Sequence, residues 1–342
     1  MPGVEPQRPA VAVVGTGSIG RRHLEVLLEL GCEAPIAISE HRRVDRVEVG
    51  AHSIEVVHRL VDAVDRVDAV IVASPTSLHL GHLRTAVGSG RHVLVEKPVA
   101  TNSGGLDDVV AEAAERGLVA AAGHQFRYEP GLVTIRDMIR DGSLGTLLAV
   151  EAHQGEHLAD YHPDEDYRAG YAARRNLGGG VLRTQIHHID VLEWIFGPLE
   201  RVYASGGHVT DLEIDVEDSA SYLFRSVAGT PVYGHLDYLQ RPRTVTLSVV
   251  GVDGRVDWDH YAARLVHTPS GGEPIVTTWP YDRQAMFRSQ MSDFLDAVGG
   301  AGTSRSTTPA VGTTLQEGVR AVRLVEAIER SCSDDQAIDV DG

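Results

Sequence analysis

The segment that most constrains the fold of this chain is the glycine-rich stretch Gly15-Thr16-Gly17-Ser18-Ile19-Gly20. It directly follows an apolar run at 11–15 and leads into a segment at 21–30 whose apolar residues recur at helical spacing. In such a G-x-G-x-x-G arrangement the glycines allow a tight turn, a close approach of the backbone to a pyrophosphate, and close helix–strand packing. The helix N-terminus adds partial positive charge. The segment therefore predicts a strand–turn–helix unit that binds a dinucleotide.

Short apolar runs alternate with helical patterns up to about residue 123, which is typical of a parallel sheet with crossover helices. The strand-like runs lie at 11–15, 35–39, 68–74, 92–96 and 118–123, and the helical patterns lie at 21–30, 79–90 and 106–117. We expect a doubly wound α/β Rossmann domain that spans residues 8–127.

After about residue 130 the pattern changes. A helix at about 131–141, a strand at about 145–153 and a helix at about 181–196 precede a series of β-like stretches: YASGG, SASYLFR, TPVYGHLDYL, TVTLSVVG and RVDWDHYAARLV. Two closing helices are expected at about 284–298 and 310–330, on either side of a Gly/Ser/Thr-rich stretch at 299–308. We expect residues 128–342 to form an α+β domain for substrate binding and oligomerisation, with a large, mainly antiparallel open sheet.

The net charge of −17, from 48 acidic and 31 basic residues, excludes nucleic acid and an anionic membrane surface as expected partners. No apolar run approaches the roughly 20 residues that a membrane helix needs. Cys32 and Cys332 stand far apart, in no spacing typical of zinc or of a disulfide scaffold. We expect a protein of the reducing cytoplasm.

Glu40 lies 20 residues after Gly20, at the end of the second strand-like run. At this spacing a carboxylate accepts hydrogen bonds from the adenosine ribose hydroxyls, which favours NAD. However, His41, Arg42 and Arg43 follow at once and would neutralise the additional phosphate of NADP. We expect NAD as the cofactor, with NADP as the alternative.

Two further motifs follow, namely Ala73-Ser74-Pro75-Thr76 with His79 three residues on, and Arg91-His92-Val93-Leu94-Val95-Glu96-Lys97-Pro98. In this order, and at this distance from the glycine motif, they resemble the A-T/S-P-x-x-x-H and G-K/R-H-V-x-x-E-K-P segments of the Gfo/Idh/MocA family of sugar and cyclitol oxidoreductases. The segments at 123–128 and 178–190 extend the resemblance over most of residues 11–200.

The resemblance implies a cis-proline turn at Pro98, a position for Lys97 at the junction of nicotinamide and substrate, and proton transfer by His187. A histidine with a pKa of about 6.5 suits proton transfer near neutrality. A lysine ammonium stabilises negative charge that develops on the same oxygen. The alternatives are a solvated lysine and a histidine that caps or packs at a helix start. Further cofactor contacts are expected from Ser74, Pro75, Thr76, His79, Glu96 and Gln125.

The chain departs from the family pattern before His187. The family usually has an aspartate three or four residues earlier, where this chain has Thr184 and Arg183. Asp190, one helical turn after His187, is a candidate to orient the imidazole instead, because residues three apart share a helix face. The alternative is an acid favoured by the helix dipole near the helix start. How the missing carboxylate is compensated stays open.

The segment at 154–177 is too long, and too rich in Tyr, Arg and His, for a simple connection. Its D-Y-R sequence resembles a branch of the family associated with surface and secondary-metabolite sugars. We expect side chains from this segment and from its surroundings to face substrate hydroxyls or a carboxylate: Tyr167, Arg168, Arg127, Tyr128 and Gln185. The alternative is a solvated, charged loop.

A metal site is not expected in this segment. His153, His157 and His162 lie near Asp160 and Asp164, but Gly155 and Pro163 prevent a regular helix that would present these side chains together.

The favoured function is therefore hydride transfer between nicotinamide and a carbinol or keto carbon of a sugar, nucleotide sugar or cyclitol. One alternative is an NAD-dependent redox glycosidase or lyase, and another is a non-catalytic sensor of sugar and cofactor. We expect a homodimer or homotetramer packed through sheet faces. Substrate identity and reaction direction stay open.

Overall fold

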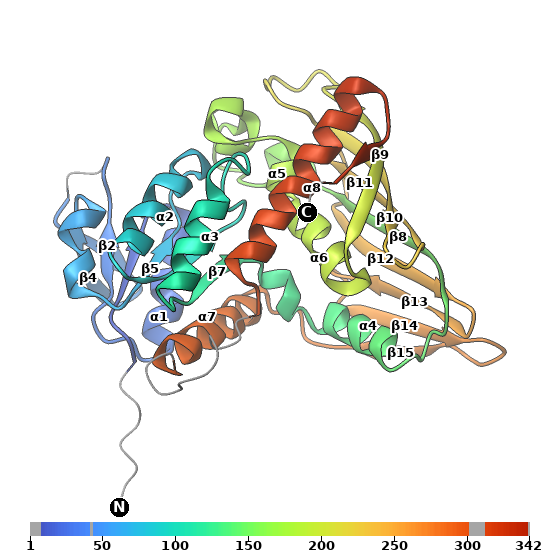
Figure 1. Cartoon of the computed structure of the whole chain (residues 1–342), viewed down its shortest axis with the longest axis horizontal. Coiled ribbons are helices and arrows are strands. Elements are labelled where there is room, and N and C mark those ends of the chain that lie inside the picture. Colours follow the sequence, from blue (N-terminus) through green and yellow to red (C-terminus); the bar gives the residue numbers. More distant parts are fainter. Residues whose placement is uncertain (1–7, 42–43, 301–311, 341–342) are drawn as a thin grey trace, which may run out of the picture. The chain divides into compact units, whose positions relative to one another are not determined.

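The computed structural model describes residues 8–41, 44–300 and 312–340, and it contains two compact units (Figure 1). The first unit extends as far as Gln125 and also includes Arg283–Val319, whereas the second comprises Phe126–Asp282 and the chain from Arg320 onward. Arg42 and most of the Gly/Ser/Thr-rich stretch lie outside the described residues.

The sheet of the first unit has seven strands in the order β3-β4-β2-β1-β5-β6-β7. All neighbours are parallel except the edge pair β3–β4. The strands are β1 (Val11–Val14), β2 (Ile36–Ile38), β3 (Arg46–Val49), β4 (His52–Val57), β5 (Ala69–Val72), β6 (His92–Glu96) and β7 (Ala120–Gly123). The order reverses between β1 and β5, and in doubly wound sheets ligands bind beyond the carboxyl ends of the strands at this point. The predicted Rossmann fold is confirmed.

Helices α1 (Ser18–Glu29), α2 (His79–Gly88), α3 (Leu106–Glu115) and α7 (Arg283–Gly300) complete the first unit. The apolar faces of α1 and α7 meet in one core, where Leu24 and Leu27 join Phe287, Met291 and Phe294. This arrangement differs from the predicted division into 8–127 and 128–342, which assigned α7 to the other domain. Amphipathic spacing shows that a helix covers a core but not which sheet it covers.

The second unit contains a nine-stranded sheet in the order β15-β14-β13-β12-β8-β11-β10-β9-β16. Only β8 and β11 are parallel, so the predicted large and mainly antiparallel sheet is confirmed. The strands are β8 (Leu147–Gly155), β9 (Leu199–Gly207), β10 (Ser219–Ser226), β11 (Pro231–Asp237), β12 (Thr244–Gly251), β13 (Gly254–Asp259), β14 (Arg264–Pro269), β15 (Ile275–Thr278) and β16 (Ile338–Asp339).

One face of this sheet packs against the helices α4 (Pro130–Arg140), α5 (Val181–Thr184) and α6 (Ile186–Phe196). The other face, which we call the open face, exposes Tyr203, Leu223 and Tyr233 side by side on register-paired positions of β9, β10 and β11. Helix α8 (Leu315–Asp334) begins in the first unit and ends in the second. No helix in the described part of the chain is long and apolar enough to cross a membrane.

Several predicted elements differ in detail from those observed. Gln185, with φ −100° and ψ 22°, interrupts the predicted helix at 181–196 and separates α5 from α6. The stretch RVDWDHYAARLV forms two strands, because Ala263 adopts a positive φ of 46° at the turn between β13 and β14. Strands β3, β4, β15 and β16 were not predicted.

Candidate cofactor and active site

The three motif glycines meet different constraints at the start of α1. Gly15 has a φ of +106°, and a Cβ there would lie 2.4 Å from the carbonyl oxygen of Ala73 at the end of β5. A Cβ on Gly20 would lie 2.0 Å from the carbonyl oxygen of Gly15. Packing therefore requires both glycines. Gly17 differs, because a Cβ there would have no heavy atom within 4 Å.

The described residues provide no N-cap side chain at the start of α1. Gly17 is the N-cap residue, no cap hydrogen bond is formed, and the first turn has no acidic residue. The turn therefore offers backbone N–H groups, the positive end of the helix dipole and open space in front of Gly17, which together fit a pyrophosphate. Thr16 beside it is buried, and its hydroxyl lies 3.5 Å from Ser39 Oγ.

Glu40 follows β2 and remains about 39% exposed. Its Oε1 lies 3.5 Å from Nε2 of His82 on α2, and Nδ1 of the same ring lies 3.0 Å from Ser74 Oγ. The structure therefore brings two predicted cofactor residues together through a histidine that the sequence analysis missed. His82 stands one helical turn after the motif histidine His79, and this spacing was the available signal. His41 is exposed.

His79 connects two loops at the carboxyl ends of the strands. Its Nδ1 lies 2.8 Å from the carbonyl oxygen of Pro98, and its Nε2 lies 2.7 Å from that of Ser74. The side chain is buried, and burial lowers its pKa although the two carbonyl groups oppose this effect. The ring therefore lies between the Ser74–Thr76 turn and the turn that follows Lys97, which indicates a positioning role. Contact of His79 with the cofactor stays a prediction.

Glu96 ends β6 in a fully buried position. Its Oε1 lies 2.7 Å from Nε2 of His23 on α1, and its Oε2 accepts a hydrogen bond of 3.2 Å from the backbone N–H of Lys97. Burial alone would raise the pKa of Glu96, but the hydrogen bond and charge of His23, with the charge of Lys97, outweigh burial and lower it. An ionised Glu96 therefore anchors the backbone of Lys97.

The Lys97–Pro98 peptide bond is cis, as the family resemblance implied. Gln125, the last residue of the N-terminal segment of the first unit, is buried, and its Oε1 has no hydrogen-bond partner among the described residues. A buried acceptor of this kind suits a ligand that donates a hydrogen bond.

His187 is the second residue of α6 and is 7% exposed. Its ring stacks on Phe126, with the ring centroids 5.2 Å apart and the planes 13° from parallel. The neighbouring His188 faces the sheet instead, with Nδ1 3.3 Å from the hydroxyl of Tyr222. Burial lowers the pKa of His188 to about 3, so this residue stays neutral near pH 7. His188 is therefore held in the core of the second unit, and the proton-transfer role of His187 stays a prediction.

Asp190 accepts two hydrogen bonds from Arg127, at 3.0 Å from Nε and 2.6 Å from Nη2. Both side chains are at most 4% exposed, and the guanidinium lies 5.8 Å from the ring of Trp194. Arg127 and Asp190 thus form a buried, bidentate ion pair that attaches the segment after Gln125 to α6. This geometry favours a structural role for both residues over the predicted roles in substrate contact and in orienting His187.

Replacement of Asp190 by Asn is expected to destabilise the chain by about 3 to 5 kcal/mol, because it removes the negative charge that the buried guanidinium of Arg127 contacts through two nitrogen atoms. The measurement is the free energy of unfolding in urea. The matched control is Glu55→Gln, which breaks a bidentate but exposed pair with Arg66 and should cost at most about 1 kcal/mol. Equal losses in the two variants would show that the Arg127–Asp190 pair contributes no more than a surface pair.

Arg183 and Thr184 occupy the two positions at which the resemblance implies an aspartate, and both contact other residues. Arg183 forms a bidentate pair with Glu329 of α8, with Nη2 2.8 Å from Oε2. Thr184 Oγ1 accepts a hydrogen bond of 2.6 Å from the hydroxyl of Tyr238. Neither residue supplies a carboxylate, so the standard lysine–aspartate–histidine set is incomplete in this chain.

Gln185 lies at the break between α5 and α6, directly before the helix that carries His187. Its Nε2 donates to the hydroxyl of Tyr161 and to the backbone oxygen of Asp237, both at 2.9 Å. Its Oε1 is buried and has no hydrogen-bond partner in the described part of the chain. The amide therefore has its nitrogen fixed and its oxygen available as an acceptor.

The predicted substrate loop forms short 3-10 turns: η5 (Leu158–Asp160), η6 (Tyr167–Ala169), η7 (Tyr171–Ala173) and η8 (Arg175–Leu177). Arg168 already pairs with Asp166 and Glu213, with contacts of 2.8 Å to each. The hydroxyl of Tyr167 accepts a hydrogen bond of 3.4 Å from the backbone N–H of Glu213. These contacts favour loop anchoring for both residues. Tyr128, in the turn Gln125–Tyr128, is half-buried.

Glu129 caps the N-terminus of α4 from a buried position, where its Oε2 accepts from the backbone N–H of Leu132 at 2.9 Å. Burial raises its pKa to about 7, against the opposing effect of Leu132, the indole of Trp258 and the backbone of Gly131. Because the folded state holds this proton more tightly than the unfolded state, the contribution to stability is complete below about pH 4.5. It is lost as the pH rises through 7.

Glu129→Gln is therefore expected to remove a pH dependence. The unfolding free energy of the unmodified chain, relative to that of the variant, should fall by up to about 3 kcal/mol between about pH 4.5 and pH 8. The measurement is a series of urea titrations of both proteins across this range. Parallel curves for the two proteins would contradict a raised pKa at Glu129.

Comparison with known proteins agrees with this geometry. A model described as the oxidoreductase family with an NAD-binding Rossmann fold matches residues 10–124, and a GFO/IDH/MocA C-terminal domain matches residues 132–257. The chain is 24% identical over 340 residues to D-xylose 1-dehydrogenase (NADP(+)) 2 of Haloferax volcanii, across 96% of this chain and 99% of the relative. It is 24% identical over 332 residues to the rhizopine catabolism protein MocA of Rhizobium meliloti, across 95% of each chain.

Among solved structures, GenD2 from gentamicin A biosynthesis in complex with NAD superimposes with a TM-score of 0.79 and 25% identity, across 99% of each chain. The two family models together match well over half of the residues, and they meet near the boundary between the two compact units. The chain thus belongs to the Gfo/Idh/MocA family of oxidoreductases, with an NAD-binding Rossmann fold in its N-terminal part.

Proposed function

We propose that this chain is an NAD(H)-dependent dehydrogenase or reductase that acts on a carbinol or keto carbon of a sugar, nucleotide sugar or cyclitol. The observation that carries the proposal is the glycine turn, in which Gly17 faces open space at the uncapped start of α1. The xylose dehydrogenase among the relatives and the NAD complex of GenD2 support it. NAD is proposed over NADP because the carboxylate of Glu40 follows the end of β2. At this position it can accept hydrogen bonds from the ribose hydroxyls of NAD, and it would repel the additional phosphate of NADP.

The proposed chemistry assigns proton transfer to His187 and charge stabilisation to Lys97. The nicotinamide, when bound, supplies the hydride acceptor or donor. Removal of a hydride from a carbinol leaves the hydroxyl proton, which His187 takes up, with its ring plane held by Phe126. The ammonium of Lys97 stabilises negative charge on the same oxygen, and Glu96 anchors its backbone. Gln185 and Tyr128 are proposed to contact substrate hydroxyls.

Composition supports a specific role for Lys97. It is the single lysine among the 31 basic residues of the chain. Arginine could equally well provide a solvated positive charge, and the other 30 of the 31 lysine and arginine residues are arginine. An ammonium differs from a guanidinium in being a compact donor whose pKa shifts readily. This preference weighs against the interpretation of Lys97 as a simple surface charge.

We further propose that Arg127, Asp190, Tyr167 and Arg168 hold their own segments in place and do not contact the substrate. We also propose that the chain forms a cytoplasmic homo-oligomer through its open sheet face. The support for the oligomer is the row of exposed apolar side chains, Tyr203, Leu223 and Tyr233, at register-paired positions. Contiguous exposed apolar residues of this kind are typical of protein–protein contacts.

The test is a panel of aldoses, cyclitols and nucleotide sugars, assayed with NAD⁺ or NADP⁺, and a panel of the corresponding ketoses and keto sugars assayed with NADH or NADPH. The absorbance of reduced nicotinamide reports net turnover. We expect stoichiometric turnover with at least one substrate, faster with NAD(H). Product formation without net cofactor turnover would instead identify a redox lyase or glycosidase, and binding without product would identify a sensor.

A further inference from the structure

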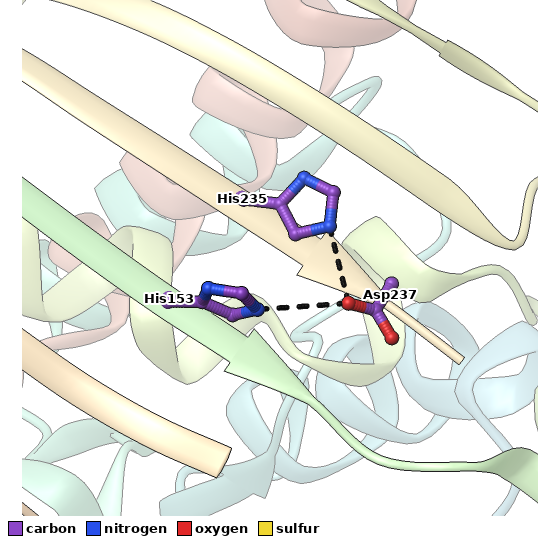
Figure 2. A group of neighbouring side chains, drawn as sticks. All are labelled: His153, His235 and Asp237. Atoms are coloured by element: carbon purple, nitrogen blue, oxygen red, sulfur yellow. Dashed lines mark hydrogen bonds and ion pairs between the residues drawn. The ribbon is translucent and has the colours of Figure 1, made fainter. Parts of the chain in front are cut away.

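We propose that His153, His235 and Asp237 form a binding site for a divalent transition-metal ion of the Zn²⁺ class, separate from the dinucleotide site. Figure 2 shows both rings directed at the carboxylate of Asp237. His153 on β8 and His235 on β11 are register partners of the one parallel strand pair in this sheet, and Asp237 ends β11. Imidazole and carboxylate are the ligands of many Zn²⁺ sites.

The ligand atoms already lie close to the separation that an ion requires. His235 Nε2 is 3.1 Å and His153 Nε2 is 3.6 Å from Asp237 Oδ2, and all three atoms lie within 4.8 Å of one another. Ligand atoms about 2.1 Å from a tetrahedral Zn²⁺ are separated from each other by about 3.4 Å. Rotation of the side chains, without movement of the strands, is therefore enough to complete the site.

The surrounding hydrogen bonds leave Nε2 of His235 and Oδ2 of Asp237 available as metal ligands. Ser221 Oγ lies 2.7 Å from His235 Nδ1, so a hydroxyl that accepts from Nδ1–H leaves the lone pair on Nε2. Asp237 Oδ1 accepts from the backbone N–H groups of Leu239 and Gln240, at 2.8 and 3.1 Å, which leaves Oδ2 for an ion. Metal-binding histidines and carboxylates are typically oriented by hydrogen bonds of this kind.

In a single chain, an ion in solution can reach the cluster. The side chains of His153 and His235 are 39% and 24% exposed, whereas Asp237 is only 3% exposed. His153 also lines, with Glu151 and Tyr233, a hollow of about 380 Å³. In the structure the amide nitrogen of Gln240 contacts both His153 Nε2 and Asp237 Oδ2. This neutral donor occupies the approach to the cluster, and an ion would displace it.

This site was not predicted from the sequence, because only the residues close to His153 along the chain were candidate ligands: His157, Asp160, His162 and Asp164. The partners His235 and Asp237 come from a strand far along the chain, and only the pairing of β8 with β11 brings them together. His157 and Asp160 instead bind Arg241.

The experiment is calorimetric titration of the tag-free, chelator-treated full chain with Zn²⁺ alone. We expect one equivalent to bind, and we expect His153→Ala and His235→Ala each to weaken binding by at least about tenfold. The matched control is His52→Ala, which removes an exposed histidine of the first unit and should bind like the unmodified chain. Zn²⁺ should also raise the melting temperature of the unmodified chain and of this control, but not that of the two cluster variants.

A second measurement needs no variant. Co²⁺ added to the unmodified chain should give the visible absorption of an ion held by nitrogen and oxygen ligands in a site of low coordination number. A chain that binds no Zn²⁺ and gives no such Co²⁺ spectrum would overturn the proposal, and so would undiminished binding in both cluster variants. Neither readout depends on turnover, so the outcome is independent of the proposed oxidoreductase activity.

Discussion

Gly17→Val should lower the affinity for NADH by at least about 100-fold, close to 3 kcal/mol, while the chain stays folded. The valine side chain would project into the open space in front of the first turn of α1, where no described residue beyond its two chain neighbours has a heavy atom within 4 Å of the Cβ position. It would therefore collide with a pyrophosphate but not with the protein. The measurement is calorimetric titration with NADH, combined with circular dichroism to establish the fold.

The matched control is Gly88→Val at the end of α2, where an added Cβ also meets nothing within 4 Å. This variant should keep its NADH affinity. Gly20→Ala should behave differently from both, because its Cβ would lie 2.0 Å from the carbonyl oxygen of Gly15 and the turn itself must shift. A folded Gly17→Val chain with normal affinity would place the dinucleotide away from this turn.

Lys97→Ala should reduce kcat by about 10²- to 10⁴-fold, with NADH affinity nearly unchanged, because the ammonium acts on charge that develops during the reaction. Lys97→Arg should recover little of the loss, since a planar guanidinium cannot replace a compact ammonium at one oxygen. The measurement is steady-state kinetics with a substrate identified in the panel. The control is Arg59→Ala, which removes an exposed cation that pairs only loosely with Asp62.

The same assay distinguishes the proposed role of His187 from that of Lys97. His187→Ala should lower kcat by a similar factor and should also change the pH profile of kcat/KM, because it removes the proposed proton acceptor. Unchanged rates in both Lys97→Ala and His187→Ala would refute the assignment of the chemistry. A loss of rate without any change in the pH profile of the His187 variant would point to a packing role against Phe126.

The Rossmann fold was predictable because its signals are local. The glycine motif and the runs at 68–74 and 92–96 predicted the positions of strands along the chain, and Glu40 follows the end of β2. The hairpin β3–β4 was missed, although its alternating pattern on either side of Gly50, with a φ of +55°, carried a signal. The packing of α7 with the first unit had no local signal, because amphipathic spacing does not name a partner.

The candidate site was harder to predict, because its side chains act through contacts between distant segments. Asp190 was recognised as a helical acid, but the guanidinium of Arg127 that it binds is 63 positions away. Likewise, His23 stands within the motif helix, and only the folded structure pairs it with Glu96. Which partner a buried polar group selects depends on tertiary packing, and the spacing of residues along one element does not contain this information.

A crystal structure of the chain with bound NADH would locate the dinucleotide. We expect the pyrophosphate to lie against the backbone N–H groups at the start of α1, the ribose hydroxyls to bind the carboxylate of Glu40, and the nicotinamide to lie beside Lys97. A dinucleotide bound elsewhere, or a nicotinamide remote from Lys97, would contradict this expectation.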